Sequence, residues 1–135
     1  MGKLAGRVAI ITGGGRGIGR ATAELFAQEG CKIVIATRTA APGEEVAAKI
    51  NASGGEALVI AADIGTHAAS RDVVKQAVDR FGCLDIVLHN AAYIPQGFIG
   101  QMPDEDLDKI LDVGLKACFW LLGDAIPYLE KSPAA

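Results

Sequence analysis

Five glycines occupy seven consecutive positions, from Gly13 to Gly19, in the segment ITGGGRGIGRATAELF. A short apolar run precedes them, and residues with a helical apolar period follow. At such a turn, backbone N–H groups and the dipole of the helix converge on an anion, and missing side chains allow it a close approach. The segment therefore predicts a site for phosphate groups.

Three interpretations of this loop remain open. The first is a dinucleotide-binding loop, although the strict Gly-x-Gly-x-x-Gly spacing fails, because its third glycine would fall on Ile18 or Arg20. A mononucleotide P-loop is nearly matched, but Arg20 and Ala21 stand where Lys and Ser or Thr are required. A glycine turn without a ligand is the third interpretation, and the conformational entropy of five glycines disfavours it.

Four short runs are almost entirely apolar, which is typical of strands covered on both faces of a parallel sheet. They are Val8–Thr12, Lys32–Ala36, Ala57–Ala61 and Asp85–His89. Helical segments lie between them, and Gly30 and Gly82 stand where these helices should end. This βαβαβαβ order predicts an α/β fold of the Rossmann type, a doubly wound parallel sheet, as one domain over residues 1–135.

A last helix should begin near Pro103–Leu107, where the acidic residues suit the positive end of the helix dipole. Its expected apolar face comprises Leu107, Ile110, Leu111, Leu115, Cys118, Phe119, Leu122 and Ile126. Such a crossover should lead to a fifth parallel strand, and an uncovered apolar edge strand would favour aggregation. We therefore expect the first half of a doubly wound domain, cut or disordered after Ala135. A self-sufficient four-stranded protein is the alternative.

Composition narrows the class of protein. The formal net charge of -3 offers no basic face for nucleic acid or an anionic membrane. No apolar run resembles a secretory signal, and Lys116, Asp124 and Pro127 interrupt the most apolar stretch, so a soluble cytoplasmic protein without a membrane span is expected. The three cysteines are scattered, which predicts reduced and mostly buried thiols and no metal site.

Several motifs in order resemble the short-chain dehydrogenase/reductase family over essentially the whole chain. TGGGRGIG matches its Thr-Gly-x-x-x-Gly-x-Gly fingerprint, and Asp63 in AADI stands where the family carries an aspartate at the adenine. HNAA, from His89 to Ala92, corresponds to its Asn-Asn-Ala-Gly motif, and LDVGLKACF resembles the helix motif around a catalytic asparagine. Considered alone, Asp63 is an ordinary cap or strand-end residue and Asn90 a turn residue.

The resemblance implies a nicotinamide dinucleotide cofactor. Its implied contacts are Gly13, Gly15, Gly17, Ile18 and Gly19 at the diphosphate, Arg16, Thr37 and Arg38 at the adenosine phosphate, Asp63 and Ile64 at the adenine, and Asn90, Ala91 and Ala92 along the ribose.

The end of the second strand should select between the two nicotinamide cofactors. NAD binders place a carboxylate there, about 20 residues beyond the loop, to bind the ribose 2′-hydroxyl. This chain has Thr37 and then Arg38, and the carboxylates of Glu44 and Glu45 come too late. A guanidinium binds phosphate through two charge-assisted hydrogen bonds, and Arg16 adds a second cation. We predict NADP(H) over NAD(H), with two solvated surface arginines as the alternative.

The catalytic group of the family is not found in this chain. A tyrosine with a lysine four residues later, and a serine, carry its chemistry, because a nearby cation lowers the pKa of the phenol. Tyr93 precedes IPQG, and Tyr128 and Lys131 are three residues apart, which indicates a helix-end pair. Gly114 occupies the position of the asparagine that holds a water in the family's proton relay.

The resemblance implies an NADP-dependent oxidoreductase that transfers a hydride between the nicotinamide and a carbonyl or secondary alcohol. A non-catalytic dinucleotide-binding protein, such as a sensor or degenerate relative, is the alternative. A homodimer or homotetramer through Leu107–Leu129 is expected, with Phe119 and Trp120 about 100° apart on that helix. The segment Tyr93–Met102 should border the substrate entrance. His89 is expected to be structural, and His67 to lie on a helix surface.

Overall fold

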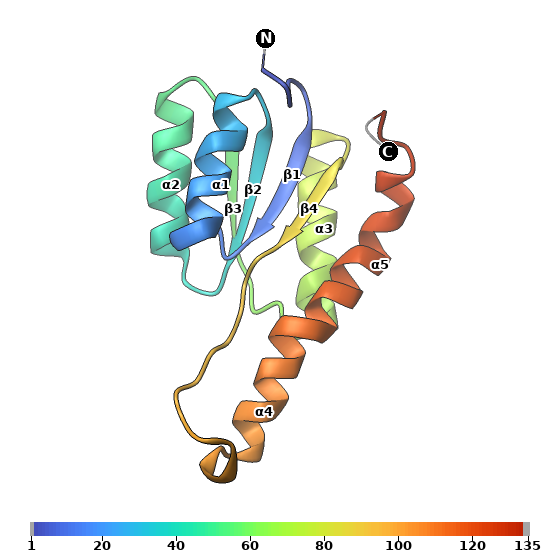
Figure 1. Ribbon diagram of the computed structural model, residues 1–135. Helices are drawn as coiled ribbons and strands as arrows, with labels where there is room; N and C mark the ends of the chain where they lie inside the picture. The colour runs from blue at the N-terminus through green and yellow to red at the C-terminus, as the bar shows by residue number, and fades with distance from the viewer. Residues whose placement is uncertain (1, 134–135) are drawn as a thin grey trace.

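The computed structural model describes residues 2–133 and contains one parallel sheet of four strands in the order β3-β2-β1-β4 (Figure 1). The strands are β1 (Val8–Thr12), β2 (Lys32–Thr37), β3 (Ala57–Ala61) and β4 (Ile86–His89). Ile10 on β1 pairs with Val34 on β2 and with Val87 on β4. The predicted doubly wound α/β fold is confirmed within this range, and the strand bounds differ from the prediction by one residue at most.

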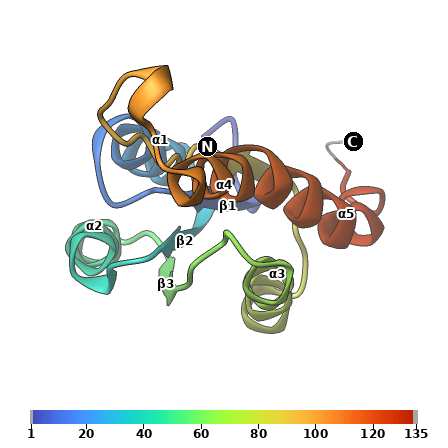
Figure 2. The same cartoon turned by 90° about the horizontal axis from the view of Figure 1, so that it is seen from below.

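Helices cover both faces of the sheet, as the view along the strands shows (Figure 2). On one face, α1 (Gly17–Gln28) and α2 (Ala40–Ala52) bury a core with Ala9, Ile11, Ile33 and Ile35. On the other, α3 (His67–Phe81) and α5 (Ala117–Leu129) bury a core with Val8, Ile10, Val34 and Ala36. Alternate residues of each strand thus enter opposite cores, which explains why the runs are continuously apolar.

Glycines end two helices, as predicted. Gly82 is the C-cap of α3 with φ 80°, and Gly30 follows the end of α1 with φ 87°. Both glycines adopt the left-handed conformation that terminates helices with little steric cost.

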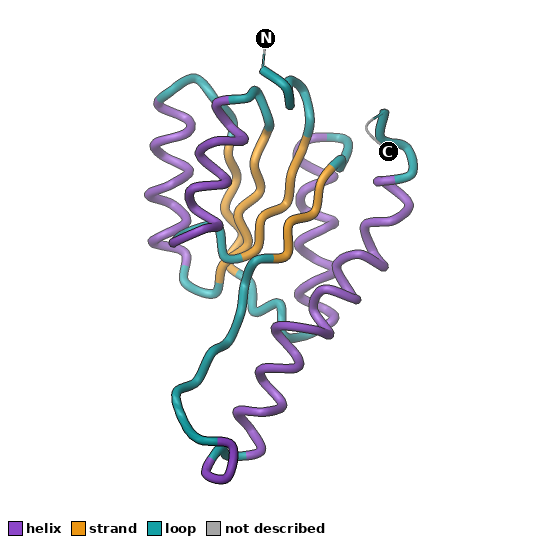
Figure 3. Tube along the Cα trace, in the orientation of Figure 1, coloured by secondary structure: helices purple, strands orange, loops and turns teal. Residues whose placement is uncertain are grey.

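The segment after β4 runs away from the sheet and returns as one long helical rod (Figure 3). It contains the 3-10 turn Ile99–Gln101, helix α4 (Asp104–Leu111), the π-helical turn Asp112–Lys116, and α5, which continues through Pro127. The π turn was not predicted from the sequence. Since a π turn advances by an i→i+5 bond, it rotates the later residues around the helix axis relative to a continuous α-helix.

The predicted apolar face of this rod is present, but it is not the side that packs against the sheet. The buried stripe is Val113, Ala117, Leu121 and Ala125, of which three are packed against the sheet and α3. Most of the predicted face is exposed instead, including Leu115 and Phe119, which are 66% and 77% exposed. Small residues permit the close approach of α5 to α3, while the larger apolar residues form the outer surface.

Cysteine burial also differs from the prediction. Cys31 is buried, Cys118 is half-buried, and Cys83 is exposed beyond the end of α3.

Among residues 2–133, no helix is long and apolar enough to cross a membrane. The expectation about the chain after Ala135 lies outside the described residues.

Candidate functional site

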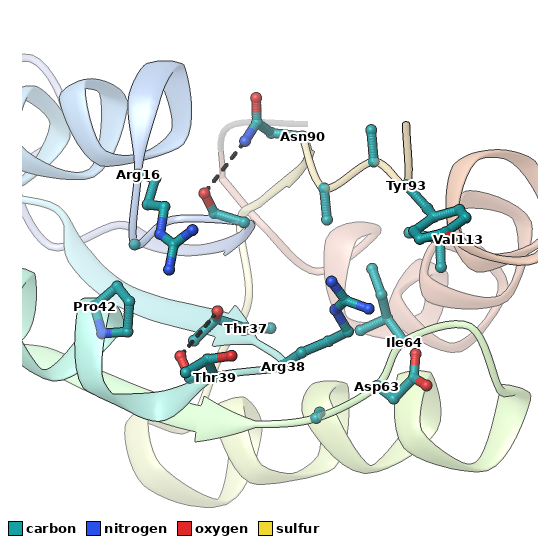
Figure 4. Close-up of a pocket in the computed structure, with 16 residues that line it drawn as sticks. Arg16, Thr37, Arg38, Thr39, Pro42, Asp63, Ile64, Asn90, Tyr93 and Val113 are labelled. Carbon is teal, nitrogen blue, oxygen red and sulfur yellow. Dashed lines mark hydrogen bonds between the residues drawn. The ribbon is translucent and has the colours of Figure 1, made fainter. Parts of the chain in front are cut away.

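A pocket opens where the carboxyl ends of all four strands meet (Figure 4). The loop after β1 and the first turn of α2 border one side, and the segment after β4 borders another. Its lining residues are Gly13, Gly15, Arg16, Ala36, Thr37, Arg38, Thr39, Pro42, Ala62, Asp63, Ile64, Asn90, Ala91, Ala92, Tyr93 and Val113. This edge of an open parallel sheet is where α/β proteins bind ligands.

Most of the residues expected to contact a cofactor lie in the wall of this pocket. Gly17, Ile18 and Gly19 do not; they form the first turn of α1 beside it. Ile18 is 78% exposed and does not line the pocket. The group it could offer to an anion at the helix start is its backbone N–H. Gly19 is buried under the loop.

Two positions in the loop favour glycine: Gly17 because of its backbone conformation, and Gly19 because there is no space for a side chain. Gly17 adopts φ 52°, a left-handed conformation that favours glycine. A Cβ at Gly19 would collide with the carbonyl oxygen of Gly13 and lie 2.6 Å from Asn90 Nδ2. The loop and the first turn of α1 are therefore packed closer than any side chain would allow.

The segment after β4 is hydrogen-bonded to the glycine loop. Asn90 Nδ2 donates to the carbonyl oxygens of Thr12 (3.3 Å) and Gly13 (3.4 Å). The Thr12 hydroxyl accepts from the backbone N–H groups of Asn90 and Ala91, each at 3.0 Å. Asn90 thus has a structural role, as its turn interpretation suggested, but it holds a distant segment as well as lining the pocket.

The arginines that line the pocket differ in their salt bridges from the arginines elsewhere on the described surface. Arg7, Arg20, Arg71 and Arg80 form salt bridges with carboxylates. Within the described residues, Arg16 and Arg38 form none, and Figure 4 shows both guanidinium groups directed into the pocket. Two cations without carboxylate partners make this wall suited to an anion.

The carboxylates nearest in sequence to Arg38, on Glu44 and Glu45, do not line the pocket. Glu45 accepts from Arg20 at 2.9 Å, and its carboxylate does not line the pocket. The Thr37 hydroxyl donates to the Thr39 carbonyl at 3.2 Å, which holds the turn between β2 and α2. Thr37, at the position predicted to select the cofactor, is a short, neutral side chain.

Asp63 lines the far side of the pocket. One carboxylate oxygen, Oδ1, accepts the Gly65 N–H at 3.1 Å, which makes Asp63 a turn residue as well. Its other oxygen accepts no hydrogen bond from the described protein. Ile64 is buried beside it and contributes to the core under α3.

Tyr93, which was expected only at the substrate entrance, lies in the pocket wall. Its hydroxyl donates to Asp106 Oδ1 at 2.8 Å, and Lys109 Nζ lies 4.7 Å from the ring centroid. The hydrogen bond to Asp106 raises the pKa of the Tyr93 phenol. An acid–base tyrosine needs a lowered pKa, so Tyr93 is not prepared for that role.

Sequence reasoning missed six lining residues: Ala36, Thr39, Pro42, Ala62, Tyr93 as a wall residue, and Val113. Thr39 and Pro42 had a detectable signal, since Thr then Pro commonly mark a helix start. Val113 had none, because the π turn determines which way it faces.

Tyr128 and Lys131 lie at the opposite edge of the sheet. They line a small hollow with Arg7 and Asp85, near the amino ends of β1 and β4, and the Lys131 N–H donates to the Tyr128 carbonyl. This position, far from the glycine loop in Figure 1, supports the helix-end interpretation.

Phe119 faces solvent, whereas Trp120 stacks on His67 with ring centroids 5.4 Å apart, so the two side chains do point apart.

The sequence profile described as short chain dehydrogenase matches residues 7–135. An uncharacterized oxidoreductase of Thermotoga maritima is 38% identical over 126 residues, covering 93% of this chain and 49% of the relative. A 2,5-dichloro-2,5-cyclohexadiene-1,4-diol dehydrogenase of Sphingobium indicum is also 38% identical, covering 96% and 52%.

Solved structures give the same result. A short chain dehydrogenase of Burkholderia cenocepacia in complex with NADP superposes with a TM-score of 0.91 at 34% identity, covering 94% of this chain and 52% of that one. A Serratia marcescens short-chain dehydrogenase/reductase variant gives 0.89 at 35% identity, covering 93% and 52%. The chain spans about half the length of these relatives.

Proposed function

The chain belongs to the short-chain dehydrogenase family, and on that premise we propose that it binds NADP(H) in preference to NAD(H) as part of an oxidoreductase. The reaction proposed for the whole protein moves a hydride between the nicotinamide and a carbonyl or secondary alcohol. The observation that carries the cofactor preference is the pair of guanidinium groups, Arg16 and Arg38, that face the pocket without carboxylate partners among residues 2–133.

The residues present fit such a cofactor. Gly17, at the start of α1, has no side chain to fill the open space around it, and a helix start attracts the diphosphate. Arg38 and Arg16 would bind the 2′-phosphate, Asp63 and Ile64 would flank the adenine, and Asn90 to Ala92 would lie along the nicotinamide ribose. When bound, the nicotinamide would supply the hydride acceptor or donor.

Nucleotide titration tests the preference. We expect NADP⁺ to bind more tightly than NAD⁺ in calorimetric titrations at one ionic strength. Arg38→Ala should weaken NADP⁺ binding by about 10- to 100-fold, the range for a lost charge-assisted contact, and change NAD⁺ binding little. Arg80→Ala removes an arginine paired with Glu56 far from the pocket and serves as the control. Tighter NAD⁺ binding, or an unaltered Arg38→Ala, would refute the preference.

A non-catalytic dinucleotide-binding protein remains the second proposal. Gly114 favours it, because this residue has no side chain at the family's asparagine position and is exposed in the π turn. Turnover of NADPH with a panel of carbonyl compounds, measured on the whole protein, distinguishes the two proposals.

We also propose self-association through the outer face of α5, as the family resemblance implies. Phe119 would lie at the centre of this contact with Leu115, Leu122 and Ile126, all of which are exposed. Sedimentation of Phe119→Asp should then show smaller particles than the wild type; equal sizes would count against this surface. The cytoplasmic location and a small-molecule substrate are parts of the same proposal.

A further inference from the structure

His89 links the strand end to the last helix. Its Nδ1 lies 3.0 Å from the Thr12 hydroxyl, and its Nε2 lies 2.9 Å from the Val113 carbonyl oxygen and 3.2 Å from that of Gly114. The His89 ring, at the end of β4, therefore links β1 to the π turn. Val113, its partner in that turn, lies 24 residues further along the chain. It does not line the pocket but lies behind it.

The partners of the ring determine its protonation. Carbonyl oxygens only accept, so Nε2 must carry a hydrogen. The Thr12 hydroxyl, which is fully buried, already accepts two N–H groups from Asn90 and Ala91, so its own hydrogen is free to be donated to Nδ1. These bonds together require a neutral imidazole with the hydrogen on Nε2.

The π turn explains why a donor is needed at Val113. In an α-helix the Ala117 N–H would donate to the Val113 carbonyl, but here it donates to the Asp112 carbonyl. Val113 O thereby loses its usual donor within the helix. The His89 N–H replaces that donor from outside the helix.

The residues bound through this ring belong to three walls of the pocket. Thr12 immediately precedes Gly13 of the glycine loop, Asn90 and Ala91 follow β4, and Val113 projects from the π turn. On the basis of the proposed nucleotide binding, we propose that His89 is a positioning residue: it holds these three walls in register for the cofactor. It acts through Thr12 and Val113 and does not contact the nucleotide itself.

This assignment connects two departures from the family pattern. His89 replaces the first asparagine of the strand motif, and Gly114 replaces the asparagine of the helix motif. Gly114 has no side chain with which to hold the π turn, and the strand residue supplies the bond to this turn instead.

The hydrogen-bond chain is tested first by NMR of ¹⁵N-histidine-labelled protein at neutral pH. We expect the His89 ring to show an unprotonated Nδ1 and a protonated Nε2, and Thr12→Val to shift the Nδ1 signal because it removes the hydroxyl donor. A hydrogen on Nδ1, or a His89 spectrum unaffected by Thr12→Val, would overturn the proposal.

Binding of NADP⁺ then tests positioning, at a temperature where circular dichroism shows each variant folded. His89→Leu should weaken binding about tenfold, the change expected for one hydrogen-bonded link. His89→Gln should recover most of the loss, since an amide also offers one acceptor and one donor. His67→Leu, which removes the other histidine on the exposed start of α3, is the matched control and should bind as the wild type does.

A double-mutant cycle gives the sharpest result. If His89 acts through Thr12, its replacement by Leu should cost much less in a Thr12→Val background than in the wild type. Additive losses, or His89→Leu binding as tightly as the wild type, would contradict positioning. Should His89→Leu fail to fold, His89→Gln and the NMR signals still decide. Failure of the wild type to bind NADP⁺ would instead refute the proposed function and leave the histidine spectrum as a separate test of the link.

Discussion

The two ends of the sheet differ in whether the arginines that line a hollow there are paired with carboxylates. At the amino ends of the strands, Arg7 pairs with Asp85, and Glu56 pairs with both Lys32 and Arg80. At the carboxyl ends, Arg16 and Arg38 face a pocket without carboxylate partners among the described residues. Paired charges are compatible with a role in stability, whereas unpaired cations that converge on a cavity indicate a binding surface for an anion.

Backbone geometry differs between the two ends in one respect. The π turn lies at the carboxyl end, where Val113 enters the pocket wall, whereas close backbone approaches occur at both ends, as at Gly19 and at Gly30. The π turn thus lies beside the unpaired arginines. Single substitutions at each end should separate effects on binding from effects on stability.

The largest effect is expected at the carboxyl end. Gly19→Ala should reduce NADP⁺ affinity by about 100-fold or more, because its Cβ would push the start of α1 away from Gly13. Gly123→Ala is the matched control, since nothing lies within 4 Å of a Cβ added there. Calorimetric titration measures both, and equal affinities for the two variants would remove the argument for a tightly packed phosphate loop.

The amino end should respond in stability alone. The Asp85 carboxylate is 3% exposed, accepts the Val8 N–H at 2.9 Å, pairs with Arg7 and accepts from the Ser132 hydroxyl. Asp85→Asn should lower the free energy of unfolding by about 1–3 kcal/mol, the cost of leaving buried polar groups poorly matched. Urea denaturation measures this loss. A fall in NADP⁺ affinity of the folded variant would show that the two ends are coupled.

A pH-dependent effect should arise at Cys31, near the amino ends of β1 and β2. Burial, and then the charge of Asp85, raise the pKa of this thiol to about 12. The folded state binds the thiol proton more tightly than the unfolded state does. The contribution of this proton to the free energy of unfolding is therefore complete below the ordinary thiol pKa and is lost as pH rises from about 9 towards 12. Cys31→Ser should therefore lose less stability than the wild type between pH 8 and 10.5, as followed by urea midpoints. Parallel pH profiles would contradict the buried, protonated thiol.

The smallest effect is expected in the π turn. A Cβ at Gly114 would meet nothing within 4 Å, and the glycine does not have a positive φ. Gly114→Ala should therefore raise the free energy of unfolding by up to about 1 kcal/mol through helix propensity, with NADP⁺ affinity preserved. Thermal unfolding provides the measurement. A destabilised variant would indicate that the turn requires glycine at this position.

Much of the fold could be predicted because its signals are local. Apolar runs such as Val8–Thr12 and helix stops at Gly30 and Gly82 depend on neighbours in sequence, and the structure confirms them. The glycine loop likewise identified its edge of the sheet. The buried face of the last helix could not be predicted, because both sides of that helix are apolar and the π turn determines which side meets the sheet.

The sequence by itself determined the order of the elements, the family and the residue types that gather at one edge of the sheet. Only the tertiary structure decided how those residues are used: in the part of the chain that the structure describes, Arg20 is paired and Arg38 is not, Tyr93 donates to Asp106, and His89 reaches Val113. The physical reason is that local preferences depend on adjacent residues, whereas a hydrogen bond or salt bridge depends on which distant atoms the packed helices bring within reach.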